Sequence, residues 1–319
     1  MTRLRCAILD DYQNVALKLA DWGPLADRVE TTVFDTPFAS PDAAIAALQD
    51  FEIICAMRER TPFPRAVFEA LPKLKLLITS GMRNAAIDLE AAKANDVVVC
   101  GTSMVGSPTA GLTIGLMLEL TRKIGFENAR MKAGEKWQVT LGEDIEGKTL
   151  GIVGLGKLGS QVAAIARALG MKTIAWSTNL TPEVCEKAGV TYATKEELFA
   201  KADIITIHLV LSDRSRGLVG RDDLTRMKPT AYLINTARGP IVDEAALLET
   251  LQAGKIAGAG LDTYSVEPLP LDSPLRKLDN VVITPHLGYV TAENYQRIYR
   301  EMLEGIEGWL KGEPLRKLG

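Results

Sequence analysis

The sequence has few of the features that mark several broad classes of protein. Its 37 basic and 40 acidic residues among 319 give a net charge of −3, without the basic excess typical of nucleic-acid-binding proteins. No apolar run approaches the ~18 residues that a membrane-spanning helix needs. Acidic residues directly follow the short apolar run Cys6–Leu9, a pattern unlike that of a signal peptide. We therefore expect a cytoplasmic protein that binds neither nucleic acid nor membranes.

Cysteine and histidine are also scarce. The cysteines are Cys6, Cys55, Cys100 and Cys185. Their spacings match no metal site, CxxC motif or disulfide framework, so we expect free thiols inside strands and helices, and no metal. Only two histidines, His208 and His286, are available for chemistry that needs an imidazole.

A glycine-rich segment, GLGKLG at residues 154–159, lies in the middle of the chain. It follows the apolar run Thr149–Val153, a predicted buried strand, and precedes a predicted helix over Gln161–Leu169. Glycines in this context make a tight turn and let backbone N–H groups approach a phosphate at the positive end of the helix. The pattern predicts a dinucleotide-binding site, and its mid-chain position predicts a separate upstream unit that holds the substrate.

Short apolar runs alternate with helical patterns over the first hundred residues, which favours a parallel sheet with helices on both faces. The predicted strands are Cys6–Leu9, Thr32–Phe34, Ile53–Ala56, Leu76–Thr79 and Val97–Val99. The predicted helices are Asp42–Leu48, Arg65–Leu71 and Leu89–Ala94. A long helix over Pro108–Lys123 is predicted to lead out of this unit.

The rest of the pattern predicts a second doubly wound unit around the glycine turn. Its predicted strands are Thr149–Val153, Thr173–Trp176, Ile204–His208, Ala231–Asn235, Gly258–Leu261 and Val281–Thr284, with a helix over Asp243–Ala253. A helix over Ala292–Lys311 is expected to pack back on the first unit. We predict an α/β protein of two doubly wound parallel-sheet domains.

The segments NTARG, DTYSVEP and TPHLG follow three of the later predicted strands and carry Arg238, Glu267 and His286. The carboxyl ends of parallel strands meet at one edge of the sheet, where ligands bind. There Arg238 can hold a carboxylate bidentately and polarise the neighbouring carbonyl. His286 can give the oxygen a proton as hydride arrives, with Glu267 favouring the charged imidazole. Each residue alone has an ordinary alternative role, in a surface ion pair, a loop or a turn, but the set predicts hydride transfer to a 2-oxo acid.

The four segments GLGKLG, NTARG, DTYSVEP and TPHLG, in this order and spacing, resemble the D-isomer-specific 2-hydroxyacid dehydrogenase family. This family includes glyoxylate/hydroxypyruvate reductases and phosphoglycerate dehydrogenases. The resemblance covers essentially the whole chain and implies a catalytic Arg238, Glu267 and His286. It also implies a Rossmann NAD(P)-binding domain of residues 101–290 inserted in a flavodoxin-like substrate domain of residues 1–100 and 291–319. The remaining implications are a homodimer built largely through the cofactor domain, and reduction of a small glyoxylate- or hydroxypyruvate-like 2-oxo acid to the D-2-hydroxy acid.

The resemblance further implies which residues bind the ligands. The expected cofactor-binding residues are Gly154, Gly156, Lys157, Leu158, Gly159, Ser177, Thr178, Asn179, His208, Ser212, Thr236, Ala237, Arg238, Asp262, His286 and Gly288. The expected substrate-binding residues are Arg58, Gly81, Met82 and Arg83, the last three in a loop that binds a carboxylate partly through backbone amides. For His208, a packed position at a strand end is an equal alternative. Arg58 and its neighbour Arg60 either bind a second acidic group of the substrate or are ion-paired.

The choice between NAD and NADP stays open. NAD-dependent relatives usually carry an acid about 20 residues beyond the glycines, to bind the ribose hydroxyls. Here the residues at this position are Trp176-Ser177-Thr178-Asn179, and no acid occurs before Glu183. The missing acid favours NADP slightly, because nothing repels a 2′-phosphate. No arginine follows Ser177 to bind that phosphate, so either cofactor is compatible.

Other functions are compatible with parts of the pattern. A cofactor-binding sensor or co-repressor-like protein on the same fold is the main alternative, although such proteins usually add disordered tails and peptide-binding grooves. Formate dehydrogenase shares the fold but carries Gln where Glu267 stands, and a methyltransferase would not need the arginine, acid and histidine. Trp137 and Tyr289 are expected to be packed residues rather than substrate contacts.

Overall fold

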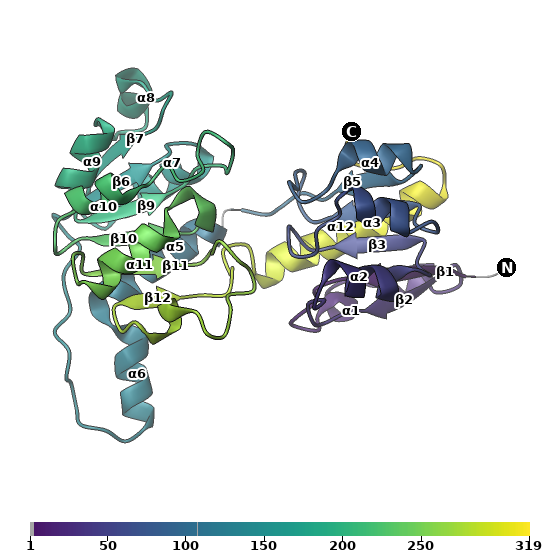
Figure 1. Ribbon diagram of the computed structural model, residues 1–319, viewed down its shortest axis with the longest axis horizontal. Helices are drawn as coiled ribbons and strands as arrows, with labels where there is room; N and C mark the ends of the chain where they lie inside the picture. Colours follow the sequence, from purple (N-terminus) through teal and green to yellow (C-terminus); the bar gives the residue numbers. More distant parts are fainter. Residues whose placement is uncertain (1–2, 107) are drawn as a thin grey trace. The chain divides into compact units, whose positions relative to one another are not determined.

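The structure is a computed structural model that describes residues 3–106 and 108–319. The chain forms two compact units, Met1–Gly106 with Thr291–Gly319, and Ser107–Val290 (Figure 1). The first unit extends to residue 106, beyond the boundary at residue 100 that the sequence predicts. The reason is that residues 100 and 101 belong to the last strand of its sheet and pair with residues 316 and 317 at the chain's end. Among the described residues, no helix has the length and apolar character needed to cross a membrane.

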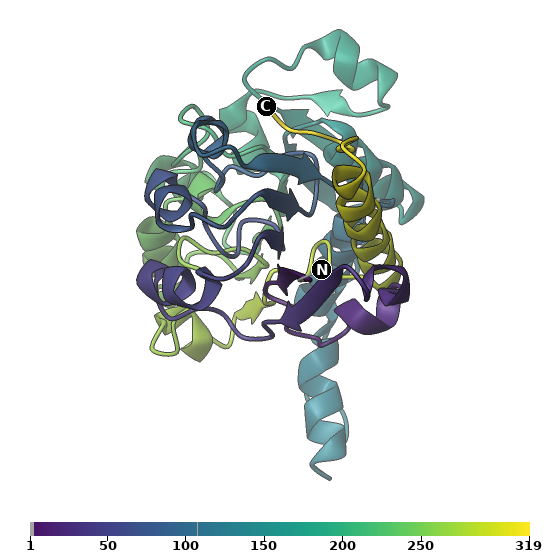
Figure 2. The same cartoon turned by 90° about the vertical axis from the view of Figure 1, so that its right-hand side faces the viewer.

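The first unit is built on a five-stranded parallel sheet with strand order β2-β1-β3-β4-β5, the flavodoxin-like order. Its strands are β1 (Leu4–Ile8), β2 (Val29–Val33), β3 (Ile53–Ala56), β4 (Leu76–Thr79) and β5 (Val98–Gly101). Its helices are α1 (Ala16–Leu19), η1 (Gly23–Leu25), α2 (Pro41–Leu48), α3 (Arg65–Ala70), α4 (Leu89–Ala94) and α12 (Ala292–Leu310). In Figure 2 the blue to purple helices α2, α3 and α4 lie on one side of this sheet and the yellow-olive helix α12 lies on the other.

Burial on both faces explains why these strands are continuous apolar runs. Every residue of β3 and β4 is buried, as expected for a parallel sheet covered by helices. The returning helix α12 covers one face closely. The Tyr299 hydroxyl donates to Asp11 Oδ1 at 3.2 Å, and a Cβ added to Gly305 would lie 2.9 Å from the Ile78 side chain. The predicted return of the C-terminal helix to the first unit is therefore confirmed.

The second unit is built on a seven-stranded parallel sheet with strand order β12-β11-β10-β9-β6-β7-β8. Its strands are β6 (Thr149–Val153), β7 (Lys172–Trp176), β8 (Thr191–Tyr192), β9 (Ile204–Ile207), β10 (Tyr232–Asn235), β11 (Gly258–Leu261) and β12 (Val281–Ile283). Its helices are α5 (Pro108–Arg122), α6 (Ile124–Lys132), α7 (Lys157–Ala168), α8 (Pro182–Lys187), α9 (Lys195–Lys201), α10 (Arg221–Arg226), η2 (Gly239–Ile241), α11 (Glu244–Gln252) and η3 (Pro274–Lys277). Numbered within the unit, the order begins 3-2-1-4-5-6, which is the Rossmann order, with one further strand at the edge. The predicted fold class is confirmed.

The winding of this sheet reverses between β6 and β9, which pair directly. In doubly wound sheets the crevice at such a reversal, beyond the carboxyl ends of the strands, is where a dinucleotide binds. The glycine turn follows β6 and leads straight into α7. The helix begins at Lys157, four residues before the predicted start, because Gly156 is already its N-cap and accepts the N–H of Ser160 at 2.9 Å.

Candidate active site

Two of the three expected catalytic side chains meet at the carboxyl edge of the seven-stranded sheet. His286 follows β12 and Glu267 follows β11, and the imidazole Nδ1 lies 2.6 Å from Glu267 Oε2. The other carboxylate oxygen of Glu267 accepts the N–H of Tyr264 at 2.9 Å. Because Nδ1 is engaged by the acid, Nε2 is the ring nitrogen through which His286 can serve a ligand. The His286 side chain is 20% exposed, enough for a reacting group to approach it.

The backbone at His286 is unusual, with φ at +55°, in the left-handed region that non-glycine residues rarely occupy. Buried Asp262, at the end of β11, holds this turn. One carboxylate oxygen accepts from the Thr284 hydroxyl at 2.6 Å and from the N–H of Leu287 at 2.7 Å, and the other accepts from the N–H of Gly288 at 2.8 Å. Burial raises the pKa of Asp262, and these three hydrogen bonds oppose that rise. Asp262 thus fixes the conformation that presents His286.

Arg238 follows β10, the neighbouring strand, and its Nη1 donates to the carbonyl of Ala237 at 2.7 Å. Asn235 locks the turn, since its side chain accepts the N–H of Ala237 and donates to the carbonyl of Arg238, both at 3.0 Å. The next residue must be glycine. A Cβ at Gly239 would lie 2.1 Å from the carbonyl carbon of Tyr264, so the segments that carry Arg238 and Glu267 pack backbone to backbone.

Each glycine of the turn after β6 has its own role. Gly154 has φ at +102°, and a Cβ there would lie 2.8 Å from the carbonyl oxygen of His208. A Cβ on Gly159 would lie 2.1 Å from the carbonyl oxygen of Gly154. Gly156, in contrast, faces open space at the N-terminus of the twelve-residue helix α7. Open space, backbone amides and a helix N-terminus fit the pyrophosphate of a dinucleotide. Lys157 is exposed beside this space and Leu158 is partly buried.

The end of β7 carries the residues expected to face the adenosine ribose. Ser177 is partly buried, while Thr178 and Asn179 are exposed. The first acid beyond them, Glu183, lies in the first turn of α8, where the Thr181 hydroxyl and its own backbone lower its pKa. Glu183 therefore serves its own helix terminus.

The segment after β9 lies against the glycine turn and includes His208 and Ser212. The His208 Nε2 pairs with the Thr206 hydroxyl at 3.0 Å, and its buried Nδ1 has no hydrogen-bond partner within the described part of the chain. Removal from water lowers the pKa of His208 to about 4, so the ring is neutral near pH 7. Ser212 begins a tight loop in which its N–H donates to the Ser215 hydroxyl at 2.7 Å. These contacts fit both the expected cofactor role and the packed alternative for His208.

Thr236 and Ala237 are buried next to Arg238. The Thr236 hydroxyl pairs with that of Thr113 at 2.9 Å, which ties this turn to helix α5. Residues that no sequence motif marks as ligand-binding therefore hold the site together. They are Asn235, Tyr264, Thr284 and Thr113, and only the first three lie within or beside a recognised segment.

The expected substrate loop of the first unit follows β4. Gly81 has φ at +89°, and its N–H already donates to the Thr102 hydroxyl at 3.0 Å. The amides of Met82 and Arg83 make no hydrogen bond within residues 3–106 and 108–319. Both side chains are exposed. The available donors of this loop are therefore the amides of residues 82 and 83 and the Arg83 guanidinium, rather than the Gly81 amide.

Arg58 and Arg60, which follow β3, are engaged inside the first unit. The Arg58 Nη1 donates to the carbonyl of Ser80 at 3.2 Å and Nη2 lies 3.4 Å from Glu59, leaving the side chain 17% exposed. Arg60 donates to the carbonyl of Asp10 at 2.8 Å, and its guanidinium lies 4.4 Å from the centre of the Tyr12 ring. The structure therefore gives Arg58 an internal role in supporting the loop.

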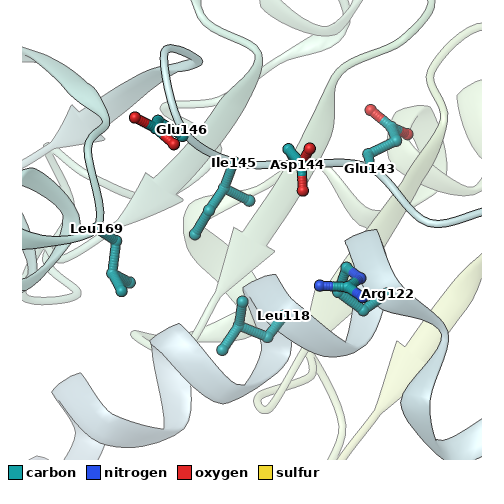
Figure 3. Close-up of a pocket in the computed structure, with 7 residues that line it drawn as sticks. All are labelled: Leu118, Arg122, Glu143, Asp144, Ile145, Glu146 and Leu169. Carbon is teal, nitrogen blue, oxygen red and sulfur yellow. The ribbon is translucent and has the colours of Figure 1, made fainter.

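A pocket of about 290 Å³ lies in the second unit (Figure 3). It is lined by Leu118, Arg122, Glu143, Asp144, Ile145, Glu146 and Leu169. Glu146 precedes β6 and Leu169 follows α7, which places the pocket at the amino ends of the strands. None of the expected site residues lines it.

Comparison with known proteins gives consistent results. Residues 114–288 match the family described as "D-isomer specific 2-hydroxyacid dehydrogenase, NAD binding domain". The chain is 31% identical to the hydroxypyruvate reductase of Blautia hydrogenotrophica over 98% of each protein. It is 39% identical to the D-3-phosphoglycerate dehydrogenase of Methanocaldococcus jannaschii over 83% of this chain, and spans about half of that relative, 51% of its length. A crystal structure of a phosphoglycerate oxidoreductase from Vibrio cholerae is 33% identical with a TM-score of 0.92, covering 97% of this chain and 99% of that one.

Proposed function

The chain belongs to the D-isomer specific 2-hydroxyacid dehydrogenase family and is an oxidoreductase that acts on a CH–OH group; on this premise we propose that it reduces a small 2-oxo acid to the D-2-hydroxy acid with NADH or NADPH. The observation that carries the proposal is the contact between His286 and Glu267 at 2.6 Å, on the edge of the sheet where the glycine turn lies. An imidazole held by a carboxylate at one nitrogen and open at the other is the arrangement of a general acid.

The residues divide the reaction among themselves. When bound, the reduced nicotinamide supplies the hydride that arrives at the carbonyl carbon of the substrate. His286 donates the Nε2 proton to the carbonyl oxygen, so that the product forms as a neutral hydroxyl group rather than as an alkoxide. Glu267 stabilises the imidazolium before transfer and keeps Nδ1 engaged. Arg238 binds the substrate carboxylate through two N–H groups and polarises the adjacent carbonyl.

The first unit contributes substrate binding in this proposal. The amides of Met82 and Arg83 are donors for an anionic group, with Gly81 allowing the close approach and Arg58 supporting the loop from behind. The substrate class is glyoxylate- or hydroxypyruvate-like, in keeping with the relative named hydroxypyruvate reductase. Residues 1–106 with 291–319 then form the substrate domain, and residues 107–290 form the cofactor domain.

For the cofactor, we propose that the site accepts NADP slightly better than NAD. The end of β7 offers Ser177, Thr178 and Asn179, which can hydrogen-bond either a ribose hydroxyl or a phosphate oxygen. The first acid that follows in the sequence, Glu183, lies in the first turn of α8, where the Thr181 hydroxyl and the Glu183 backbone lower its pKa. No carboxylate at the end of β7 therefore opposes a 2′-phosphate.

We also propose a homodimer formed through the second unit. Helix α6, nine residues long, buries none of its residues and projects from this unit in Figure 1. Ile124, Phe126 and Met131 on it are at least half exposed, and Leu141 in the following segment is 97% exposed. Trp137 in the same segment is 68% exposed, so the prediction that it is packed is wrong within the single chain. An isolated helix of this length is marginal in water, so a partner surface is needed to stabilise it. A second copy of this chain meets that need.

Sedimentation equilibrium tests the dimer directly. The wild-type chain should have twice the mass of a 34.6 kDa monomer. Replacing Phe126 and Met131 together with Glu should give a monomer that keeps both α/β units, while the nine residues of α6 lose the surface that stabilises them and unwind. A wild-type monomer at micromolar concentration would contradict this part of the proposal.

The location proposed is the cytoplasm, since the four cysteines are free and buried and disulfides are rare there.

The reaction is tested by following the oxidation of NADPH and NADH at 340 nm with a panel of 2-oxo acids. The panel holds glyoxylate, hydroxypyruvate, pyruvate, 2-oxobutyrate and phenylpyruvate. Turnover with formation of the D-isomer supports the proposal, and the ratio of kcat/KM values for the two cofactors decides the preference. Tight cofactor binding with no turnover of any member would overturn the proposed substrate class and leave a sensor as the better description.

A further inference from the structure

Tyr289 is the third residue after His286 and returns to pack against it. The two rings lie with centroids 5.6 Å apart and planes at 83°, an edge-to-face contact. Tyr289 is 4% exposed, so its ring is fixed by its surroundings rather than free to swing away. The turn between the two residues is closed by the N–H of Val290, which donates to the carbonyl of Leu287 at 2.9 Å.

The contact with Glu267 does not by itself fix the plane of the imidazole. A single hydrogen bond at Nδ1 leaves the ring able to pivot about that contact, and a pivot displaces Nε2 at the far side of the ring. Proton transfer depends on this position, since a misplacement of about 1 Å can cost on the order of 10²-fold in rate. A second contact on the imidazole is therefore needed to define the direction in which Nε2 points.

The backbone of this segment supports such a role. Asp262 binds the amides of Leu287 and Gly288, and the Thr109 hydroxyl donates to the carbonyl of Gly288 at 2.7 Å. A Cβ on Gly288 would lie 3.1 Å from the Asp262 carboxylate, so the backbone of Gly288 packs closely against this side chain. The main chain that follows His286 is thus held, and Tyr289 is presented to the imidazole from a rigid position.

We propose that Tyr289 is a positioning residue for the proton donor. Its ring holds the imidazole plane of His286 so that Nε2 stays directed at the carbonyl oxygen, and the aromatic ring rather than the hydroxyl carries this effect. The inference rests on the proposed function, because it assigns a role in the same proton transfer. Tyr289 acts through His286 and supplies no group to the reaction.

The test compares Tyr289→Phe with Tyr289→Leu in the full-length chain. The Phe variant keeps the edge-to-face contact and should retain kcat within about threefold. The Leu variant should lower kcat by roughly 10- to 100-fold, with KM for substrate and Kd for cofactor changed by less than about threefold. The solvent deuterium isotope effect on kcat should rise in the Leu variant, because proton transfer becomes slower than the other steps.

A matched control separates positioning from packing. Tyr232 is also buried in the second unit, with 6% exposure. It begins β10 and so lies at the amino ends of the strands, away from the proposed site, and its hydroxyl donates to Glu143 at 2.7 Å. Tyr232→Leu should lower the melting temperature without changing the solvent isotope effect. If Tyr289→Leu behaves in the same way, Tyr289 only packs and the proposal is wrong.

A spectroscopic readout works without turnover. The chain has two histidines, so ¹⁵N spectra of the labelled imidazoles resolve His286 once His208→Asn has assigned the other. In Tyr289→Leu the His286 signals should broaden or split, whereas in Tyr289→Phe they should stay near wild-type positions. Equal loss of activity in the Phe and Leu variants would assign the effect to the hydroxyl and overturn the inference. If the wild-type chain has no reductase activity but the variants show these spectral changes, the result contradicts the proposed function and leaves the positioning role of Tyr289 standing.

Discussion

Glu267 Oε2 lies 2.6 Å from His286 Nδ1, and the second oxygen of the same carboxylate accepts the backbone N–H of Tyr264. The acid is therefore anchored to the segment after β11 while it holds a ring that belongs to the segment after β12. Neighbouring parallel strands bring the two segments together. The contact determines which imidazole nitrogen is left for a substrate, and this is the basis of the first prediction.

Replacing His286 with Ala should lower kcat for 2-oxo acid reduction by ~10²-fold or more, the scale of a lost general acid. Cofactor affinity should stay nearly unchanged, because the glycine turn and α7 are not altered. Stopped-flow or steady-state oxidation of NADPH gives kcat, and fluorescence titration gives the Kd. Turnover at the wild-type rate would remove His286 from the role of proton donor.

Replacing Arg238 with Lys should chiefly lower kcat/KM, by roughly 10- to 100-fold, because an ammonium group cannot reproduce the bidentate fork of a guanidinium. The comparison variant is Arg226→Lys, on the exposed face of α10, which should be kinetically silent. If the two variants behave alike, Arg238 does not anchor the substrate carboxylate.

The fold is largely readable from the sequence because both sheets are parallel and covered on both faces. Buried strands of this kind are continuous apolar runs, and β3, β4, β6 and β11 have the residues predicted for them. The elements that the pattern missed have little burial to signal them. Both residues of β8 are exposed, and α6 buries none of its residues. Periodicity reports burial, and neither element has it: β8 pairs only at the edge of its sheet, and α6 presents the surface that we propose for the dimer interface.

The candidate site is only partly readable in this way. The order of strands places Arg238, Glu267 and His286 at one edge, and side-chain chemistry suggests that Glu267 and His286 pair. The supporting contacts depend on tertiary geometry. Nothing in the sequence indicates that Gly239 packs on the carbonyl carbon of Tyr264, or that the Arg58 guanidinium turns back to the carbonyl of Ser80. Both are contacts with backbone atoms, so the residue types do not show which segment supplies the partner.

Introducing an acid at the end of β7 should change cofactor preference. In Ser177→Asp the new carboxylate binds ribose hydroxyls and repels a 2′-phosphate, so kcat/KM for NADPH should fall roughly 10- to 100-fold relative to NADH. Ser177→Asn has nearly the same shape without the charge and should alter the ratio less than about threefold. Kinetics with both cofactors and one 2-oxo acid measure this. An unchanged ratio in Ser177→Asp would place the adenosine ribose elsewhere.

His208 should make the stability of the fold depend on pH. Its pKa is lowered by burial to about 4, whereas in the unfolded chain an imidazole titrates near 6.5. Between these values the unfolded chain binds the proton and the folded chain does not, so the free energy of unfolding falls as the pH falls through this window. From pH 7 to pH 5 this residue should account for a loss of roughly 1 to 2 kcal/mol.

The measurement for His208 is urea unfolding at pH 7, 6 and 5 on the wild type and on His208→Asn. Asn can still pair with the Thr206 hydroxyl but takes up no proton, so the variant should lose less stability than the wild type over this range. His286→Asn is the matched control for the loss of an imidazole. That ring is partly exposed and paired with a carboxylate, so its replacement should not reduce the loss of stability between pH 7 and pH 5. Parallel stability curves for the wild type and His208→Asn would mean that the ring protonates in the folded chain, and therefore that water or a charged group reaches its Nδ1.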